Sequence, residues 1–376
     1  MKYKLEQKLV VLQVIARLNL GGTAKYLITL NDGLNKAGIK SLIATGYVQT
    51  GEIEDLEVKK LKPIRIKNLG RKISLINDFK ASKEIQKVIV KVSPDVIHTH
   101  TFKAGLLVRA QRNKIEEVLG KKIKFIHTFH GHLFDDPEFN GLKKQIISFV
   151  ERYLSRRTDQ LITGGINVKR DLERKKIYGK IKSISIPPAV EQQSLLSKKG
   201  SLKRFKIKDK SRFRVLWLAR VTYVKNPLKL VLIAKSLPEF DFYMVGKGDL
   251  FRKIKALAPE NLKVLGWQDI NHVLPIADVF LSTSSNEGIP IAFMQAQLAG
   301  VPIVTTNVGS VSEVVIHNKT GFLCNDSDQQ LIAALKLLAT NRNLRKRLSK
   351  AARINILNNF STEKLITAHL GVYQRD

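Results

Sequence analysis

Short apolar runs alternate with helical patterns along this chain, and the alternation occurs twice. The apolar runs lie at residues 8–16, 41–45, 95–98, 123–128, 160–163, 213–218, 242–245, 262–265, 279–281 and 302–305. Buried strands that alternate with helices form a parallel sheet, because each helix crosses back over the sheet before the next strand begins. The sequence therefore predicts an α/β fold with two Rossmann-like domains facing across a cleft.

The length of the chain supports two domains. Its 376 residues exceed what a single hydrophobic core usually supports. A polar, basic stretch at residues 194–214 follows Pro187 and Pro188, and we predict that it links the domains. The first domain is placed at residues 1–187 and the second at 188–361.

The composition is that of a globular protein, with 44% hydrophobic residues. The chain has one cysteine, Cys324, which excludes an internal disulfide. Lys2, Lys4, Glu6 and Lys8 give the first residues a charged character unlike that of a secretory signal peptide. No window approaches about eighteen uncharged apolar residues, the usual length of a membrane span. We therefore expect a cytoplasmic protein.

The net charge of +33 is spread over both predicted domains. Up to Pro187 the chain has 37 Lys and Arg against 18 Asp and Glu, and the remainder has 28 against 14. Nucleic acid, an anionic lipid surface or phosphorylated small molecules would suit such a charge. The sequence has no zinc-finger spacing, RNA-binding aromatic signature or basic-region heptads, so nucleic acid is the least favoured of the three partners.

The loop after the apolar run 279–281 is the strongest candidate for a ligand site. It is rich in Ser, Thr and Asn and contains Glu287, Gly288, Ile289 and Pro290 before a helical segment that ends near Ala299. Ligands of open α/β sheets bind at the carboxyl ends of the strands. The helix N-terminus there would offer free backbone N–H groups to an anion or to sugar hydroxyls.

This region resembles the donor-binding region of the retaining glycosyltransferases of family 4, which have the GT-B fold. The resemblance rests on Glu287, Gly288, Ile289, Pro290, Gly300, Pro302, Asn307, Val308, Gly309 and Glu313. The family pattern has two glutamates eight residues apart, of which the first faces the donor sugar and the second binds the ribose hydroxyls. Here the second is Gln295, whose carbonyl still accepts a hydrogen bond but without a charge. The resemblance also implies a final helix, at about 362–376, that crosses back onto the first domain.

The resemblance implies two groups that bind the donor diphosphate. Gly21 and Gly22 follow the first apolar run, where glycines let the backbone approach a phosphate, although a structural tight turn explains them equally well. Arg220 and Lys225 follow the run 213–218 and match the family's pair of cations. A glycosyl–phosphate bond that breaks without a metal needs fixed cations where the leaving-group charge grows.

Five histidines cluster in two predicted strand-end segments, namely His98, His100, His127, His130 and His132. His-x-His pairs at strand ends sometimes bind zinc. No cysteine lies nearby, and both segments match family positions that bind no metal, so we expect neither a metal nor another cofactor. His130 matches the family histidine beside the reacting sugar. His98 and His100 are either core residues or residues of the acceptor side.

Three more residues match family positions at the nucleotide. Gly246 follows the run 242–245, and Trp267 and Gln268 follow the run 262–265. The family holds the base and ribose there. Trp267 is equally well explained as a core residue.

The segment 142–161 interleaves apolar and basic residues, as in helices that lie on anionic membranes, although a helix that packs on its own domain has the same pattern. Together these features predict a glycosyltransferase that moves a sugar from a nucleotide-diphosphate sugar, such as a UDP-sugar, to a lipid-linked or saccharide acceptor in cell-surface polysaccharide synthesis. It would work at the inner face of the cytoplasmic membrane, with Glu287, His130, Arg220 and Lys225 at the reacting sugar. The alternatives are a GT-B sugar-nucleotide epimerase, or a degenerate relative that binds nucleic acid or another ligand without catalysis.

Overall fold

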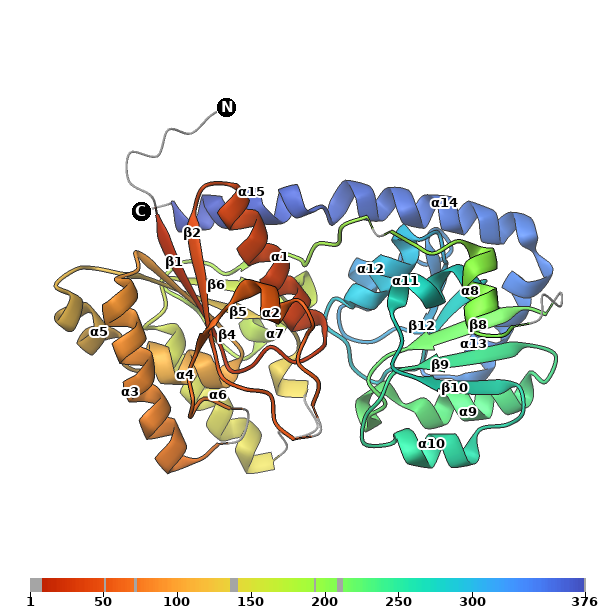
Figure 1. The fold of residues 1–376 in the computed structure, drawn as a ribbon, viewed down its shortest axis with the longest axis horizontal. Coiled ribbons are helices and arrows are strands. Elements are labelled where there is room, and N and C mark those ends of the chain that lie inside the picture. The colour runs from red at the N-terminus through yellow and green to blue at the C-terminus, as the bar shows by residue number, and fades with distance from the viewer. Residues whose placement is uncertain are drawn as a thin grey trace. The chain divides into compact units, whose positions relative to one another are not determined.

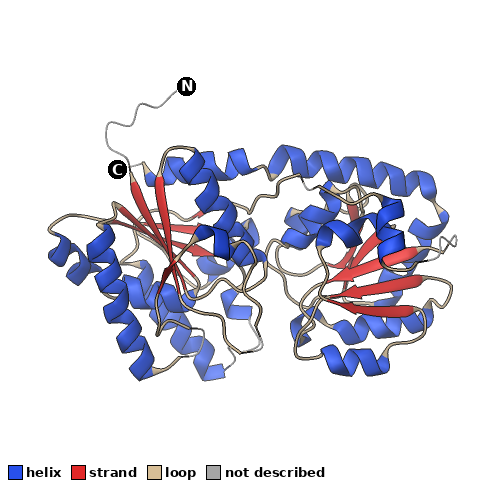
Figure 2. Cartoon of the chain, viewed as in Figure 1, coloured by secondary structure: helices blue, strands red, loops and turns tan. Residues whose placement is uncertain are grey.

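The computed structural model describes residues 9–50, 52–70, 73–135, 141–192, 194–207 and 212–374 (Figure 1). The contacts divide the chain into two compact units. Unit 1 comprises Met1–Ala189 and Thr362–Asp376, and unit 2 comprises Val190–Ser361. Each unit is a parallel sheet with helices on both faces, as Figure 2 shows, so the predicted α/β fold with two Rossmann-like domains is confirmed.

The sheet of unit 1 has seven strands in the described part of the chain, in the order β3-β2-β1-β4-β5-β6-β7. The strands are β1 (Val10–Ile15), β2 (Lys40–Thr45), β3 (Ile64–Arg65), β4 (Val96–His100), β5 (Lys124–Phe129), β6 (Gln160–Thr163) and β7 (Ile184–Ser185). The order reverses direction between β1 and β4. Strand β1 pairs with both neighbours in parallel, so the loops after β1 and β4 lie at the same edge of the sheet.

The helices of unit 1 cover both faces of its sheet. One face packs against α1 (Gly22–Lys36) and α15 (Thr362–Tyr373) through Leu30, Leu34 and Ile366. The other face of the sheet packs against α3 (Leu75–Val92), α4 (Phe102–Arg109), α5 (Arg112–Leu119), α6 (Gly141–Ser155) and α7 (Ile166–Arg174). A single turn of helix, α2 (Val58–Leu61), and a 3-10 turn, η1 (Leu133–Asp135), lie in the connections.

The described part of unit 2 has a six-stranded sheet in the order β10-β9-β8-β11-β12-β13. The strands are β8 (Arg214–Leu218), β9 (Asp241–Val245), β10 (Leu262–Gly266), β11 (Val279–Ser282), β12 (Ile303–Thr306) and β13 (Gly321–Cys324). The order reverses between β8 and β11, which are hydrogen-bonded neighbours. In open α/β sheets this reversal marks the place where ligands bind.

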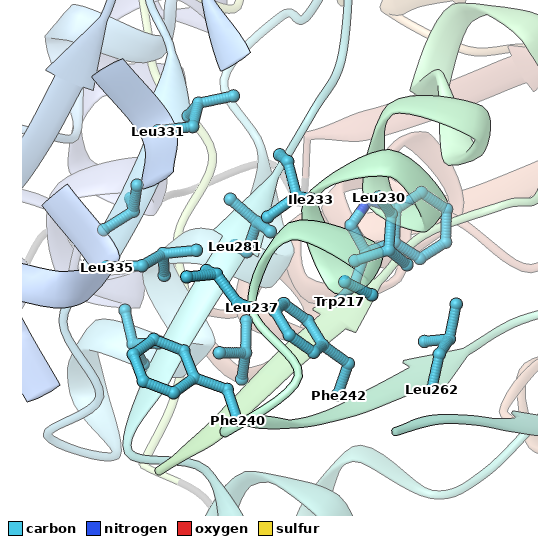
Figure 3. Close-up of a cluster of buried hydrophobic side chains, with 14 of the residues drawn as sticks. Trp217, Leu230, Ile233, Leu237, Phe240, Phe242, Leu262, Leu281, Leu331 and Leu335 are labelled. Atoms are coloured by element: carbon cyan, nitrogen blue, oxygen red, sulfur yellow. The ribbon is translucent and has the colours of Figure 1, made fainter. Parts of the chain in front are cut away.

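The helices of unit 2 form two cores, one on each face of the sheet. They are α8 (Lys198–Arg204), α9 (Pro227–Ser236), α10 (Phe251–Leu257), α11 (Ile270–Val273), α12 (Ile291–Leu298), α13 (Asp328–Thr340) and α14 (Arg342–Asn359), with 3-10 turns η2 (Tyr223–Lys225), η3 (Leu274–Ile276) and η4 (Val311–Glu313). Figure 3 shows one core, where Ile233 of α9 and Leu335 of α13 lie with Phe242 and Leu281 of the strands. These apolar contacts hold the strand ends in place.

The predicted linker at residues 194–214 is wrong. This stretch contains α8, and Leu202 and Ile207 are buried in a core of unit 2. Ser197 caps the helix by accepting a hydrogen bond from the Gly200 N–H at 3.1 Å. The many basic side chains of this stretch made it read as a solvent-exposed linker, although two of its apolar residues, five positions apart, are buried.

In the described ranges, no helix is long and apolar enough to span a bilayer.

Candidate functional site

Glu287 and Lys225 form an ion pair at the point where the strand order of unit 2 reverses. Lys225 ends η2 after β8, and Glu287 lies in the loop after β11. The Lys225 Nζ lies 2.5 Å from the Glu287 Oε1, and the two side chains are 20% and 10% exposed. The Ser284 Oγ donates to the same carboxylate oxygen at 2.7 Å. Two residues that were predicted at the reacting sugar therefore meet, although 61 residues separate them in the sequence.

The loops after β8 and β11 are joined by hydrogen bonds that fix this pair. The buried indole N–H of Trp217 donates to the Thr283 Oγ1 at 3.0 Å. The same hydroxyl donates to the carbonyls of Lys225 and Asn226 at 3.0 and 2.9 Å. The Ser285 N–H donates to the Val224 carbonyl at 2.8 Å. Both side chains of the ion pair are thus placed by buried backbone contacts rather than by a mobile loop.

The loop after β12 supports Glu287 from the other side. Gly309 has a φ of 54° and packs so closely that a Cβ would lie 1.9 Å from the Glu287 carbonyl oxygen. The Ser310 N–H donates to that oxygen at 3.0 Å, and the Thr306 Oγ1 donates to the Ser284 carbonyl at 2.5 Å. The sequence did not predict the roles of Ser284 and Thr306. It showed only that the loop is rich in hydroxyl side chains, which does not single out these two residues.

Arg220 and Gly246 lie in adjacent loops of the same sheet edge. Arg220 is exposed, and within the described part of the chain no hydrogen bond or ion pair engages its guanidinium. Gly246 follows β9 with a φ of 135°, and a Cβ there would lie 1.9 Å from the Ala219 carbonyl oxygen. Its N–H donates to the Gly266 carbonyl at 2.7 Å, which joins the loops after β8, β9 and β10.

The remaining predicted donor-site residues of unit 2 lie after β10 and around the start of α12. Trp267 is 40% exposed and is not a core residue, while the Gln268 side chain donates to the Leu265 carbonyl at 3.0 Å. Ile289 is 9% exposed and packs in the core, so it offers a ligand mainly its backbone. Gln295 is partly buried on α12, which begins directly after Pro290. Gly288 lies between Glu287 and this helix.

In unit 1, Gly21 and Gly22 lie where β1 gives way to α1. Both are exposed, and Gly21 precedes the helix without a side-chain cap. Among the described residues, no side chain caps the first N–H groups of α1, so the positive end of the helix dipole is open to an anion. This is the edge of the sheet where the strand order of unit 1 reverses.

The predicted histidine cluster exists, and α1 and α15 add residues to it. His98 and His100 of β4 are fully buried, and their ring centroids lie 4.2 Å apart. The Tyr373 hydroxyl of α15 lies 2.8 Å from the His98 Nδ1, and the Tyr26 hydroxyl of α1 lies 3.0 Å from the His369 Nε2. His127 instead contacts Thr99, and His132 contacts Asp171.

The hydrogen bonds of the cluster define the tautomer of His130. The Gln13 amide group donates to the Tyr373 hydroxyl at 3.4 Å, so the Gln13 Oε1 accepts from the His100 Nε2 at 2.8 Å. The His100 Nδ1 then accepts from the His130 Nε2 at 2.9 Å. A neutral His130 consequently has its lone pair on Nδ1. The Nδ1 atom can therefore accept a hydrogen bond from a donor such as a sugar hydroxyl.

Burial keeps these histidines neutral. It lowers the pKa of His130 to about 3 and that of His369 to about 4. Burial also holds the pKa values of His98, His100 and His127 well below the ordinary value. Neighbouring histidines lower all three further, and the Arg109 guanidinium lowers the pKa of His127 more than they do. Among the described residues, no three His, Cys, Asp or Glu side chains are placed to hold a metal ion.

Two family models cover most of the chain. The model "Glycosyltransferase Family 4" matches residues 20–193, and the model "Glycosyl transferases group 1" matches residues 199–355. The chain belongs to the family 4 glycosyltransferases. It is therefore a glycosyltransferase with the GT-B fold, which confirms both the expected family and the expected enzyme class.

Relatives and solved structures agree with this family. The chain is 29% identical to the UDP-Gal:α-D-GlcNAc-diphosphoundecaprenol α-1,3-galactosyltransferase of Escherichia coli, over 85% of each chain. It is 25% identical to the N-acetyl-α-D-glucosaminyl L-malate synthase of Bacillus anthracis, over 79% of this chain and 78% of that one. The sucrose-phosphate synthase of Thermosynechococcus elongatus has a similar fold, with a TM-score of 0.82, 17% identity and coverage of 97% and 98%. HepE of Anabaena, solved with UDP-glucose, has a TM-score of 0.79, 15% identity and coverage of 96% and 98%.

Proposed function

We propose that this glycosyltransferase moves a sugar, with retention of its anomeric configuration, from a UDP-sugar to a saccharide on a polyprenyl diphosphate during cell-surface polysaccharide synthesis. The observation that carries the proposal is the Lys225–Glu287 pair at the strand-order reversal of unit 2, with the exposed Arg220 in the same loop as Lys225. The names of two similar proteins support the substrates. One acts on a diphosphoundecaprenol-linked sugar, and the other was solved with UDP-glucose.

The chemistry of the pair suits a diphosphate leaving group. As the glycosyl–oxygen bond breaks, negative charge grows on the departing diphosphate, and preorganised cations stabilise that charge. The Lys225 ammonium and the Arg220 guanidinium supply two such cations, so we propose that the reaction needs no metal ion. A bound diphosphate would compete with Glu287 for Lys225 and would leave the carboxylate to accept hydrogen bonds from the sugar.

Unit 1 offers two further groups for such substrates. The open N-terminus of α1 at Gly21 and Gly22 suits a phosphate, and the Nδ1 lone pair of His130 suits a sugar hydroxyl. At unit 2, we propose that Gly246, Trp267, Gln268 and the loop from Gly288 to Pro290 bind the nucleotide. Gln295 would then bind a ribose hydroxyl through its neutral carbonyl.

Mass spectrometry of the purified full-length chain tests this proposal. The protein is mixed with a panel of nucleotide-diphosphate sugars, with and without a short-chain polyprenyl-diphosphate saccharide. We expect one UDP-sugar to give a product that is heavier by one sugar, only when the acceptor is present. Glu287→Gln should abolish most product, whereas Glu239→Gln, which alters an exposed carboxylate elsewhere in unit 2, should not.

The same assay separates the alternatives. An epimerase would convert the nucleotide sugar without acceptor, and a mixture in which the donor sugar is isomerised would overturn the transferase proposal. A degenerate relative would give neither transfer nor slow hydrolysis of any donor. Protection of the chain against thermal unfolding by UDP or by another nucleotide identifies the donor class independently of turnover.

A further inference from the structure

Helix α6 presents an apolar stripe to solvent. Leu142, Ile146, Phe149 and Tyr153 follow one another at helical spacing and are 71%, 54%, 71% and 48% exposed. The opposite side of the same helix is buried through Ile147 and Leu154. A helix that packs only on its own domain needs one apolar side, so the second side calls for another partner.

The first turn of α3 presents a second group of exposed apolar side chains. Leu75, Ile76 and Phe79 are 87%, 70% and 62% exposed, and Ile73 just before the helix is 64% exposed. Both α3 and α6 pack against α4, and the Lys103 ammonium of α4 lies 2.5 Å from the Asp78 carboxylate of α3. Figure 1 shows the three helices on the same side of the sheet. Both outer helices lead into a strand of one parallel sheet, so their N-terminal turns point to the same edge.

The charged residues of these two helices are mostly basic. Helix α3 carries Lys80, Lys83, Lys87 and Lys91, and helix α6 carries Lys143, Lys144 and Arg152. Their three carboxylates are all engaged within the domain. Asp78 pairs with Lys103, Glu84 accepts from the Asn68 backbone and side chain, and Glu151 is fully buried against Arg109. The Lys83 ammonium lies over the exposed Phe79 ring, 4.4 Å from its centroid.

We propose that this α3–α6 face, defined by Leu75, Ile76, Phe79, Leu142, Ile146 and Phe149, docks unit 1 onto an anionic lipid bilayer. The apolar side chains would enter the headgroup boundary while the surrounding lysines contact anionic headgroups. Only the role of this docking rests on the proposed function: it would hold the enzyme at the membrane, where a polyprenyl-linked acceptor is found.

Charge and chemistry favour lipid over two other occupants. A second copy that packed face to face would place lysines against lysines, because a twofold interface uses the same patch on both chains. Nucleic acid would use the lysines, but its phosphate backbone offers little to protruding Leu and Ile side chains. An anionic bilayer is complementary to both the cations and the apolar stripe.

Vesicle flotation of the full-length chain tests the proposal. Vesicles of phosphatidylcholine and phosphatidylglycerol should carry the protein, and Leu75→Ser, Phe79→Ser, Leu142→Ser and Phe149→Ser combined should lower its partition by about tenfold or more. The control, Leu232→Ser with Leu257→Ser, removes two exposed leucines from α9 and α10 and should change partition less than about twofold. Partition that is equal in both variants would overturn the proposal.

A charge series and an inserted fluorophore give independent measurements. Lys80→Gln with Lys83→Gln should weaken binding more than Lys346→Gln with Lys350→Gln on α14, although both remove two charges. Equal losses would mean diffuse attraction rather than a face. Tryptophan introduced by Phe149→Trp should shift its emission to the blue when vesicles are added, whereas Leu232→Trp should not.

Two controls separate this proposal from others. Donor binding, measured by calorimetry with UDP, should be unchanged in the four-serine variant, so a loss of vesicle binding alone concerns the face and not the proposed function. The oligomeric state of the wild-type chain should equal that of the variant in sedimentation. A wild-type dimer that the variant dissociates, or wild-type binding to RNA that the variant loses, would assign the face to the other partner.

Discussion

At the scale of single residues, Lys225 has two tasks that mutation can separate. It is a cation placed for the leaving diphosphate, and it also neutralises the mostly buried Glu287 carboxylate. Arg220 has no such structural partner in the described chain and is exposed. The two cations are therefore expected to differ in stability effects while sharing an effect on catalysis.

We predict that Arg220→Ala and Lys225→Ala each lower turnover by roughly a hundredfold, the scale of one lost preorganised charge contact. Lys225→Ala should also lower the free energy of unfolding by about 1–3 kcal/mol, because it leaves Glu287 without its cation. Steady-state kinetics and chemical unfolding of both variants measure these effects, with Lys235→Ala as the control for loss of an exposed lysine on α9. Wild-type turnover in Arg220→Ala or in Lys225→Ala would remove the leaving-group role of that residue.

Gln295 tests how the ribose is held. If its carbonyl accepts a ribose hydroxyl, Gln295→Glu supplies a charged acceptor and should preserve or tighten UDP binding, by on the order of 1 kcal/mol. Gln295→Ala should weaken it. Calorimetry with UDP measures both variants, and a loss of affinity in Gln295→Glu larger than about 1 kcal/mol would show that the neutral amide makes a contact of its own.

Other parts of the site were beyond prediction from the sequence. The resemblance named Glu287, Lys225 and His130, and the sheet topology brings the first two together. It did not name Tyr373 and His369, which contact His98 and Tyr26 from more than 270 residues away. Those contacts depend on how α15 packs against α1, and no local pattern of residues encodes that packing.

At the scale of helices and strands, the sequence predicted ten of the thirteen strands in the described chain and missed β3, β7 and β13. The ten predicted strands appear because each is a run of apolar residues enclosed by helices. The strands β3 and β7 have two residues each, too few to show any periodicity. β13 is four residues long and was also missed. Helix α8 was mistaken for a linker because its exposed side is basic, and its burial is indicated only by Leu202 within the helix and Ile207 three residues after its end.

The histidines that β4, β5 and α15 bring together should make unit 1 acid-sensitive. Their pKa values in the folded chain lie below the ordinary 6.5, so the unfolded chain binds more protons as the pH falls below that value. Stability is therefore retained above about pH 6.5 and lost on acidification, by up to about 1.4 kcal/mol per pH unit for each histidine. The loss continues towards the folded pKa, which is about 3 for His130.

Hydrogen exchange measured by mass spectrometry at pH 7.5 and 5.5, after correction for intrinsic rates, checks this prediction. Peptides from β4 and β5 should lose protection at the lower pH, while peptides from β8 and β11 of unit 2 serve as the internal control. His98→Asn should reduce the pH dependence of unit 1, since it removes one of the buried imidazoles. Equal pH dependence of the two units would contradict the prediction.

At the scale of the whole molecule, the charge of +33 and the apolar face on α3 and α6 should leave different signatures in salt. Exposed charges are screened beyond about 8 Å at physiological ionic strength, whereas the burial of apolar side chains is not. Cations are abundant in both units, and α14 alone carries Arg342, Arg345, Lys346, Arg347, Lys350 and Arg353 without a carboxylate. The charge acts over the whole surface, so it attracts any polyanion.

We therefore predict that binding to anionic vesicles has two components. Rising salt should remove most binding to RNA or DNA, because each phosphate contact is electrostatic. Vesicle binding should fall as well but retain a residual part in high salt, which the four-serine variant of the α3–α6 face lacks. Neutral vesicles should bind only to the extent of this residual part, since they allow apolar insertion but lack the electrostatic attraction. Flotation and nucleic-acid binding, measured side by side across the same salt series, decide between lipid and nucleic acid as the partner of this basic surface. Tight RNA binding without vesicle binding at low salt would favour nucleic acid.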